Sequence, residues 1–126
     1  GEELAPTKNT DEERERPSIK KKEQKRLRAE FIQVRSRTLS PLEQRMSSVE
    51  TAIMDLEKRI DEDNQALIRA MTMGEGKSIS ALSISIHNMR NEIETLFEEL
   101  DEVTKEYNTR SRDLEEQYNG ILSSIQ

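Results

Sequence analysis

The strongest constraint on the fold is a repeat of apolar residues at alternating steps of three and four. It occurs in two runs, residues 42–67 and residues 79–107. Apolar residues at this spacing line one face of a helix and form the seam of a coiled coil. Asp63, the one charged member of the first run, predicts a polar layer there. The runs comprise Leu42, Met46, Val49, Ile53, Leu56, Ile60, Asp63 and Leu67, then Ile79, Leu82, Ile86, Met89, Ile93, Leu96, Leu100, Val103 and Tyr107.

The composition supports a narrow seam rather than a broad core. Hydrophobic residues make up 32% of the 126-residue chain and charged residues 37%. An ordinary globular domain is roughly 45–50% apolar. The sequence therefore predicts an all-α protein whose long helices meet along one stripe.

The connection between the two runs is short and contains glycine, so the helices should fold back on each other. In an antiparallel pair, the numbers of facing residues add up to a constant. Leu56 with Ile93, Leu42 with Tyr107, and Phe31 with Tyr118 share one such sum. We therefore expect an antiparallel two-stranded intramolecular coiled-coil hairpin in a monomer. An additional N-terminal basic helix should pack on the end of the last helix.

The connection reads GEGKS, residues 74–78, and resembles the end of a phosphate-binding loop. That loop needs a first glycine five residues before Gly76, where Met71 stands, and a buried strand before it. An amphipathic helix precedes GEGKS instead. The stretch is better explained as the hairpin turn, with glycines supplying permissive backbone angles and Ser78 capping the next helix.

Prolines and glycines divide the rest of the chain. Residues 1–18 contain two prolines and no apolar period, which predicts a disordered linker. A coiled-coil domain should follow over residues 19–126, with helices at about 19–38, 41–72 and 78–125. Ser40 before Pro41, with Glu43 three residues later, has the pattern of a capping box and predicts a helix start.

The residue types argue against catalysis by this chain itself. It has one histidine, no cysteine and no convergent cluster of reactive residues, so we expect no metal site, no cofactor and no enzymatic activity here. The lack of cysteine is consistent with a cytoplasmic protein. No apolar run is long enough to span a membrane, and a first residue of Gly rather than Met suggests a fragment of a longer protein.

Charge is distributed unevenly. Residues 18–41 carry eight basic and two acidic residues, a net +6, between segments of net −3 and −9. A basic block of this kind can neutralise phosphates, without any signature for reading bases. The alternative is a solvated helix face with no ligand. The candidate nucleic-acid-binding residues are Lys20, Lys21, Lys22, Lys25, Arg26, Arg28, Arg35 and Arg37.

The sequences KKEQKRLRAE (21–30) and LSPLEQRM (39–46) resemble the C-terminal coiled-coil domain of ABC-F ATPases, which are soluble proteins with two ATP-binding cassettes. The resemblance extends from Ser18 to Ile60, whereas residues 67–82 lack the family's usual Asp-Pro and Tyr at the hairpin tip. It implies a parent chain that hydrolyses ATP with Mg. It also implies a partner, since such domains are implicated in DNA binding in some members and in ribosome contact in others.

Two functional hypotheses follow. The first is a nucleic-acid-binding accessory domain that contacts the backbone of duplex or structured DNA, or of ribosomal RNA. The second is a structural or protein-interaction coiled coil that serves as a lever or a dimer seam. The few aromatic residues, Phe31, Phe97, Tyr107 and Tyr118, are expected to pack the seam rather than to form a base-stacking platform.

Overall fold

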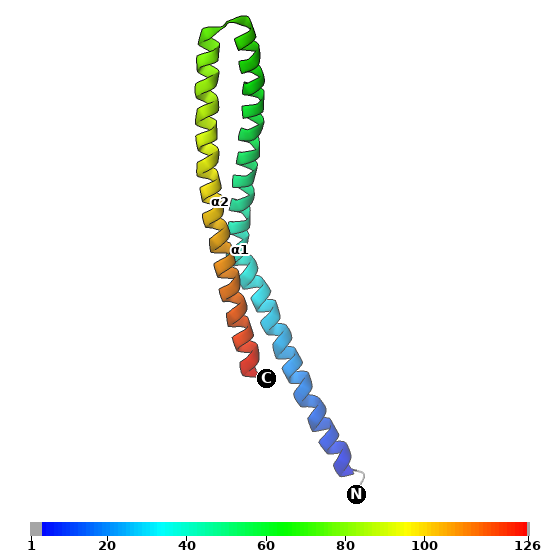
Figure 1. Ribbon diagram of the computed structural model, residues 1–126. Helices are drawn as coiled ribbons and strands as arrows, with labels where there is room; N and C mark the ends of the chain where they lie inside the picture. Colours follow the sequence, from blue (N-terminus) through cyan, green and yellow to red (C-terminus); the bar gives the residue numbers. More distant parts are fainter. Residues whose placement is uncertain (1–3, 126) are drawn as a thin grey trace. The chain divides into compact units, whose positions relative to one another are not determined.

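The computed structural model describes the backbone of residues 4–125 and the side chains of residues 20–125. Two helices account for the described chain: α1, Leu4–Met73, and α2, Gly76–Ile125 (Figure 1). The prediction of an all-α helical hairpin is confirmed. No strand occurs within the described residues.

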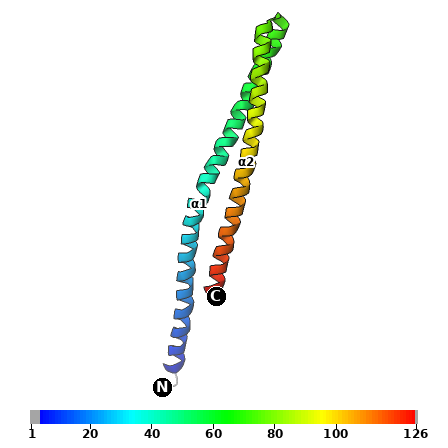
Figure 2. The same cartoon turned by 90° about the vertical axis from the view of Figure 1, so that its left-hand side faces the viewer.

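The chain divides into two compact units, each built from a piece of both helices. The hairpin unit is Pro41–Asn108, and the terminal unit is Gly1–Ser40 together with Thr109–Gln126. Within the hairpin unit, α1 and α2 run side by side in opposite directions, as Figure 1 and Figure 2 both show.

The predicted seam forms the core of the hairpin unit. Its centre is a cluster of buried side chains, with further half-buried apolar residues packed against it. Burying one such aliphatic side chain stabilises the fold by about 1.5–3 kcal/mol. The cluster contains Leu56, Ile60, Ile86 and Met89, with Leu67, Ile93 and Leu96 packed against it.

Polar contacts between the helices confirm the predicted register of the hairpin unit. Arg45 Nη2 lies 2.9 Å from Glu99 Oε1, and Tyr107 donates a 3.2 Å hydrogen bond to Glu43. Nearer the hairpin turn, the Ser85 hydroxyl donates a 3.0 Å hydrogen bond to Asp63 Oδ2. The hydrogen bond explains how a carboxylate is accommodated at a seam position, and it confirms the expected polar layer.

The hairpin turn is a Schellman motif at the end of α1. Glu75 N–H donates to Ala70 O at 3.0 Å, and Gly74 N–H donates to Met71 O at 3.4 Å. Gly74 has a φ of 69°, which favours glycine. The prediction that Ser78 caps the second helix was wrong, because α2 begins at Gly76. The carbonyl of Glu75 accepts the first backbone hydrogen bond of α2, from Ile79 N–H.

The structure also differs from the sequence-based boundaries near Ser40 and Pro41. α1 is continuous there, so no separate helix begins at Pro41. A proline inside a helix removes one backbone hydrogen bond and costs about 3 kcal/mol. The helix persists because apolar burial anchors both sides of the proline: Leu39 is buried, and Leu42 is half-buried.

Part of the expected linker is helical as well. Residues 1–3 lie outside the described residues, whereas α1 already includes Leu4–Ser18. Pro6 falls in the first turn, where backbone N–H groups have no acceptor within the helix. Residues 7–16 contain no Gly or Pro and are rich in Glu and Arg, which have good helix propensity.

Candidate functional site

A stack of two aromatic rings joins the two helices of the terminal unit. Phe31 of α1 and Tyr118 of α2 lie with ring centroids 4.5 Å apart and planes 17° from parallel. The register predicted this pair, and the stack contributes about 0.5–1.5 kcal/mol beyond its buried area. Burial around it is incomplete. Among the described residues of the terminal unit, only Leu39 is fully buried, and Val34 and Ile121 are 44% and 48% exposed.

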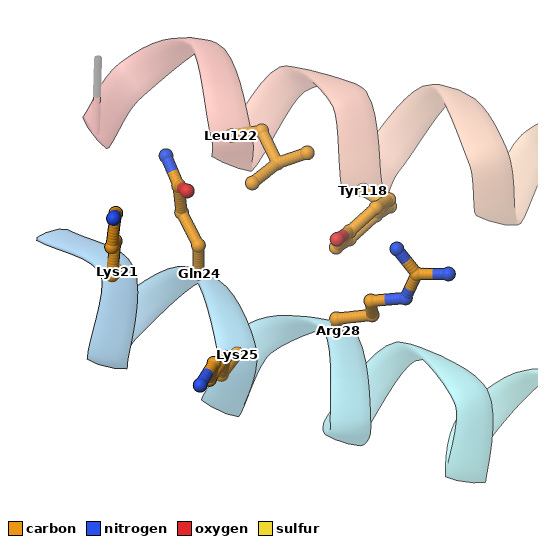
Figure 3. Close-up of a pocket in the computed structure, with 6 residues that line it drawn as sticks. All are labelled: Lys21, Gln24, Lys25, Arg28, Tyr118 and Leu122. Carbon is orange, nitrogen blue, oxygen red and sulfur yellow. The ribbon is translucent and has the colours of Figure 1, made fainter.

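An open pocket adjoins this stack. It has a volume of about 310 Å³ and is lined by side chains from both helices (Figure 3). The α1 residues are spaced by three, four and seven positions, so they share one helix face. Figure 3 shows Gln24 and Arg28 extending from α1 toward α2, and Tyr118 extending back toward α1. The lining residues are Lys21, Gln24, Lys25, Arg28, Tyr118 and Leu122.

The pocket carries positive charge that the described residues do not neutralise. Lys21, Lys25 and Arg28 are exposed, and none of them forms an ion pair with another residue whose side chain the structure describes. The opposite segment of α2, residues 117–125, has no charged residue at all. Each of these cations can bind a phosphate group, and the guanidinium of Arg28 can do so with two parallel hydrogen bonds.

The predicted basic residues divide into two groups in the structure. Lys21, Lys25 and Arg28 come together at the pocket, whereas the others lie outside its lining. Arg26 approaches Glu30, at 3.9 Å, within an exposed pair that adds little stability. Of those outside the pocket, Arg35 is half-buried, and the rest are exposed: Lys20, Lys22, Arg26 and Arg37.

Three residues of the pocket were missed by the sequence analysis: Gln24, Tyr118 and Leu122. The predicted antiparallel register nevertheless places Tyr118 and Leu122 opposite α1. The constant sum that pairs Phe31 with Tyr118 also places Leu122 opposite Leu27. The uncharged end of α2 therefore faces the most basic turns of α1, and a pocket with mixed cationic and aromatic lining follows from that pairing.

A second, apolar groove lies next to the same aromatic stack. It has a volume of about 160 Å³, and α1 and α2 both line it. Glu30 and Gln117 are its polar lining residues. The apolar lining consists of Leu27, Phe31 and Val34 of α1 and Leu114, Tyr118 and Ile121 of α2.

Neither a metal cluster nor a membrane-spanning segment appears in the part of the chain that the structure describes. There, no three His, Cys, Asp or Glu residues are grouped so that they could hold a metal ion. No described helix is sufficiently long and apolar to cross a bilayer. The cationic pocket of the terminal unit is therefore the principal candidate site.

Comparison of the chain with models of protein families, with curated proteins and with solved structures gives no match. The functional argument consequently depends on the charge, exposure and geometry of the pocket and its surroundings.

Proposed function

We propose that this chain binds nucleic acid through the basic surface of α1, residues 20–37, with contacts to the phosphate backbone. The binding surface comprises the pocket cations together with the exposed basic residues around them. Lys21 and Arg28 are seven residues apart, about 10 Å along the helix axis. That distance allows one helix face to contact successive phosphates of DNA or of structured ribosomal RNA without reading their sequence.

The observation that carries this proposal is the uncompensated charge at the pocket. The exposed cations of the pocket form no ion pair with any side chain that the structure describes. Here the facing segment of α2 is neutral, whereas the hairpin unit matches Arg45 with Glu99 across its seam. Phosphates would supply the missing negative charge, and their binding would release counterions.

The resemblance to ABC-F ATPases supports the same proposal. In this interpretation the chain is an accessory C-terminal domain of a cytoplasmic parent protein that binds ATP and Mg in its cassettes. The domain itself acts as a monomer. It performs no chemistry and holds the parent on its nucleic-acid partner.

The test is a binding titration of fluorescent DNA and RNA at increasing salt. Replacing Lys21, Lys25, Arg28 and Arg35 with Gln should abolish binding at about 50 mM salt and leave helicity unchanged. In the wild type, each phosphate contact contributes about 0.9 to the slope of log K against log salt on duplex DNA, so removing four cations should flatten the slope by up to about four units.

A matched control removes the same charge elsewhere. Lys58, Arg59, Arg69 and Arg90 are exposed residues of the hairpin unit, and replacing them with Gln changes the net charge equally. The proposal expects binding by this control to remain close to that of the wild type. Equal losses in both variants would refute a localised surface, and unchanged binding in the first variant would refute the assignment.

The apolar groove beside Phe31 favours the second candidate function, an interaction coiled coil. Its edge residues Val34 and Ile121 are about half exposed, as is the nearby Ile32 at 55%. A seam shared between chains would cover them. Sedimentation equilibrium distinguishes the two functions: a stable dimer that Val34→Ser dissociates would favour the interaction coiled coil, whereas a monomer would argue against a dimer seam.

A further inference from the structure

The half-buried aromatic ring of Tyr118 lies between the two cavities of the terminal unit. Phe31 stacks on Tyr118 and lines only the apolar groove, whereas Tyr118 lines both cavities. The cationic pocket therefore reaches a part of Tyr118 beside which Phe31 does not lie. Figure 3 shows the ring between the helices, with Arg28 beneath it and Leu122 one turn further along α2.

The combination of side chains around this ring is suited to a nucleotide rather than to a bare phosphate. A phosphate needs the cations alone. Tyr118 and Leu122 add an apolar surface against which a base can lie, and Gln24 adds an amide that can both donate and accept hydrogen bonds. The volume, about 310 Å³, is near the lower end of the roughly 300–1,000 Å³ range of small-ligand sites.

We propose that this pocket receives a single unpaired nucleotide, with its base stacked on Tyr118 and its phosphate held by Lys21, while Arg28, about 10 Å further along α1, contacts the neighbouring phosphate. The inference rests on the proposed nucleic-acid binding and specifies which form of nucleic acid the chain prefers. A base inside a duplex has both faces covered by its neighbours. Only an unpaired base, at a single strand, a gap or a branch, can offer a face to the ring.

The inference changes the role of Tyr118. A residue that only packs the seam would affect all nucleic acids equally, through the stability of the terminal unit. A residue that stacks on a base would distinguish unpaired from paired strands, because stacking occurs on any exposed base whatever its identity. Tyr118 would thus select the structure of the nucleic acid and not its sequence.

The test compares the full chain with two variants, Tyr118→Leu and Tyr118→Phe. Each is titrated with a 20-nucleotide single strand and with a blunt duplex of the same length, as DNA and as RNA. We expect Tyr118→Leu to weaken single-strand binding by about 5- to 150-fold, the loss of one stacked base, with little change for the duplex. Tyr118→Phe keeps the ring and should bind like the wild type.

A crosslinking measurement on the wild-type chain tests the same inference without relying on the folding of a variant. Single strands that carry 4-thiothymidine or 4-thiouridine should crosslink, under ultraviolet light, to the peptide that contains Tyr118 and Leu122. Crosslinks found only in other peptides would overturn the inference.

The outcomes also separate this inference from the proposed function. A wild-type chain that binds no nucleic acid refutes both. A chain that binds with the expected salt dependence, but for which Tyr118→Leu weakens single strand and duplex equally or not at all, retains the proposed function and loses the nucleotide pocket. Preference for DNA or for RNA in the single-strand arm identifies the chemical source of the ligand.

Discussion

The hairpin unit and the terminal unit are built from the same two helices but differ in burial and in the distribution of charge. The hairpin unit has a continuous core, with Ile53, Leu56 and Ile86 each 5–6% exposed. It carries fifteen acidic and seven basic residues. In the terminal unit, the packing between the two helices centres on one aromatic stack. This unit carries thirteen basic and eleven acidic residues, and eight of the basic residues but only two of the acidic ones lie in residues 20–40.

Under the proposed function, the two units have different roles. Apolar burial stabilises the hairpin unit, and its negative charge repels phosphates. The terminal unit has less apolar contact between its helices, and it has exposed cations and an open pocket. Such positions contribute little to stability, which is typical of sites that bind a partner.

The largest expected effect tests the contrast in burial with a matched pair of substitutions. Leu56→Ala in the hairpin unit should lower the free energy of unfolding by about 2–5 kcal/mol, because it leaves a cavity in the core. Leu27→Ala in the terminal unit should cost about 1 kcal/mol, since Leu27 is only half-buried. Urea denaturation followed by circular dichroism at 222 nm measures both.

Ile84→Ala is the control for the side-chain change itself. Ile84 is 61% exposed in the same hairpin unit, so its truncation should change the free energy of unfolding by less than about 1 kcal/mol. A cost for Leu27→Ala equal to that for Leu56→Ala would mean that the two units are stabilised alike, contrary to the comparison.

A smaller change in the free energy of unfolding tests whether α1 is continuous at the boundary between the units, because its sign differs between the two alternatives. If α1 continues through Ser40, as in the structure, Ser40→Ala should stabilise the protein by about 0.5 kcal/mol, because alanine has the higher helix propensity. If Ser40 caps a new helix, as the sequence suggested, the same change should destabilise it by about 1 kcal/mol. Thermal and urea unfolding give the sign.

Ser36→Ala serves as the matched control for this boundary. Ser36 is exposed and lies inside a helix under both alternatives, so its replacement should stabilise the protein by about 0.5 kcal/mol in either case. Destabilisation by Ser40→Ala, with stabilisation by Ser36→Ala, would contradict the continuous helix.

The features that depend on repeating patterns could be predicted from the sequence. The apolar spacing gave the seam, and the constant sum of residue numbers gave the antiparallel register, including the contact of Phe31 with Tyr118. The contact between Asp63 and Ser85 fits that register as well. These features follow from helix geometry, which fixes the facing residues once one pair is known.

Local signals at helix ends were less reliable. The pattern at Ser40 and Pro41 is that of a helix start, yet tertiary packing around Leu39 outweighs it. At the turn, Ser78 is a good capping residue. The Schellman motif at Gly74 nevertheless reverses the chain early enough that Glu75, three residues before Ser78, accepts the first backbone hydrogen bond of α2. The pocket was missed because the basic residues were considered as one helix face, without the neutral segment of α2 opposite them.

The measurement that tests the central claim most directly is amide chemical-shift mapping of the isotope-labelled chain during titration with a short oligonucleotide. The proposal predicts that shifts concentrate in residues 20–28 and 117–122, on both sides of the pocket, and that amides of the hairpin core at residues 53–60 and 86–96 stay unchanged. Shifts centred on the hairpin unit, or spread evenly over both units, would contradict it.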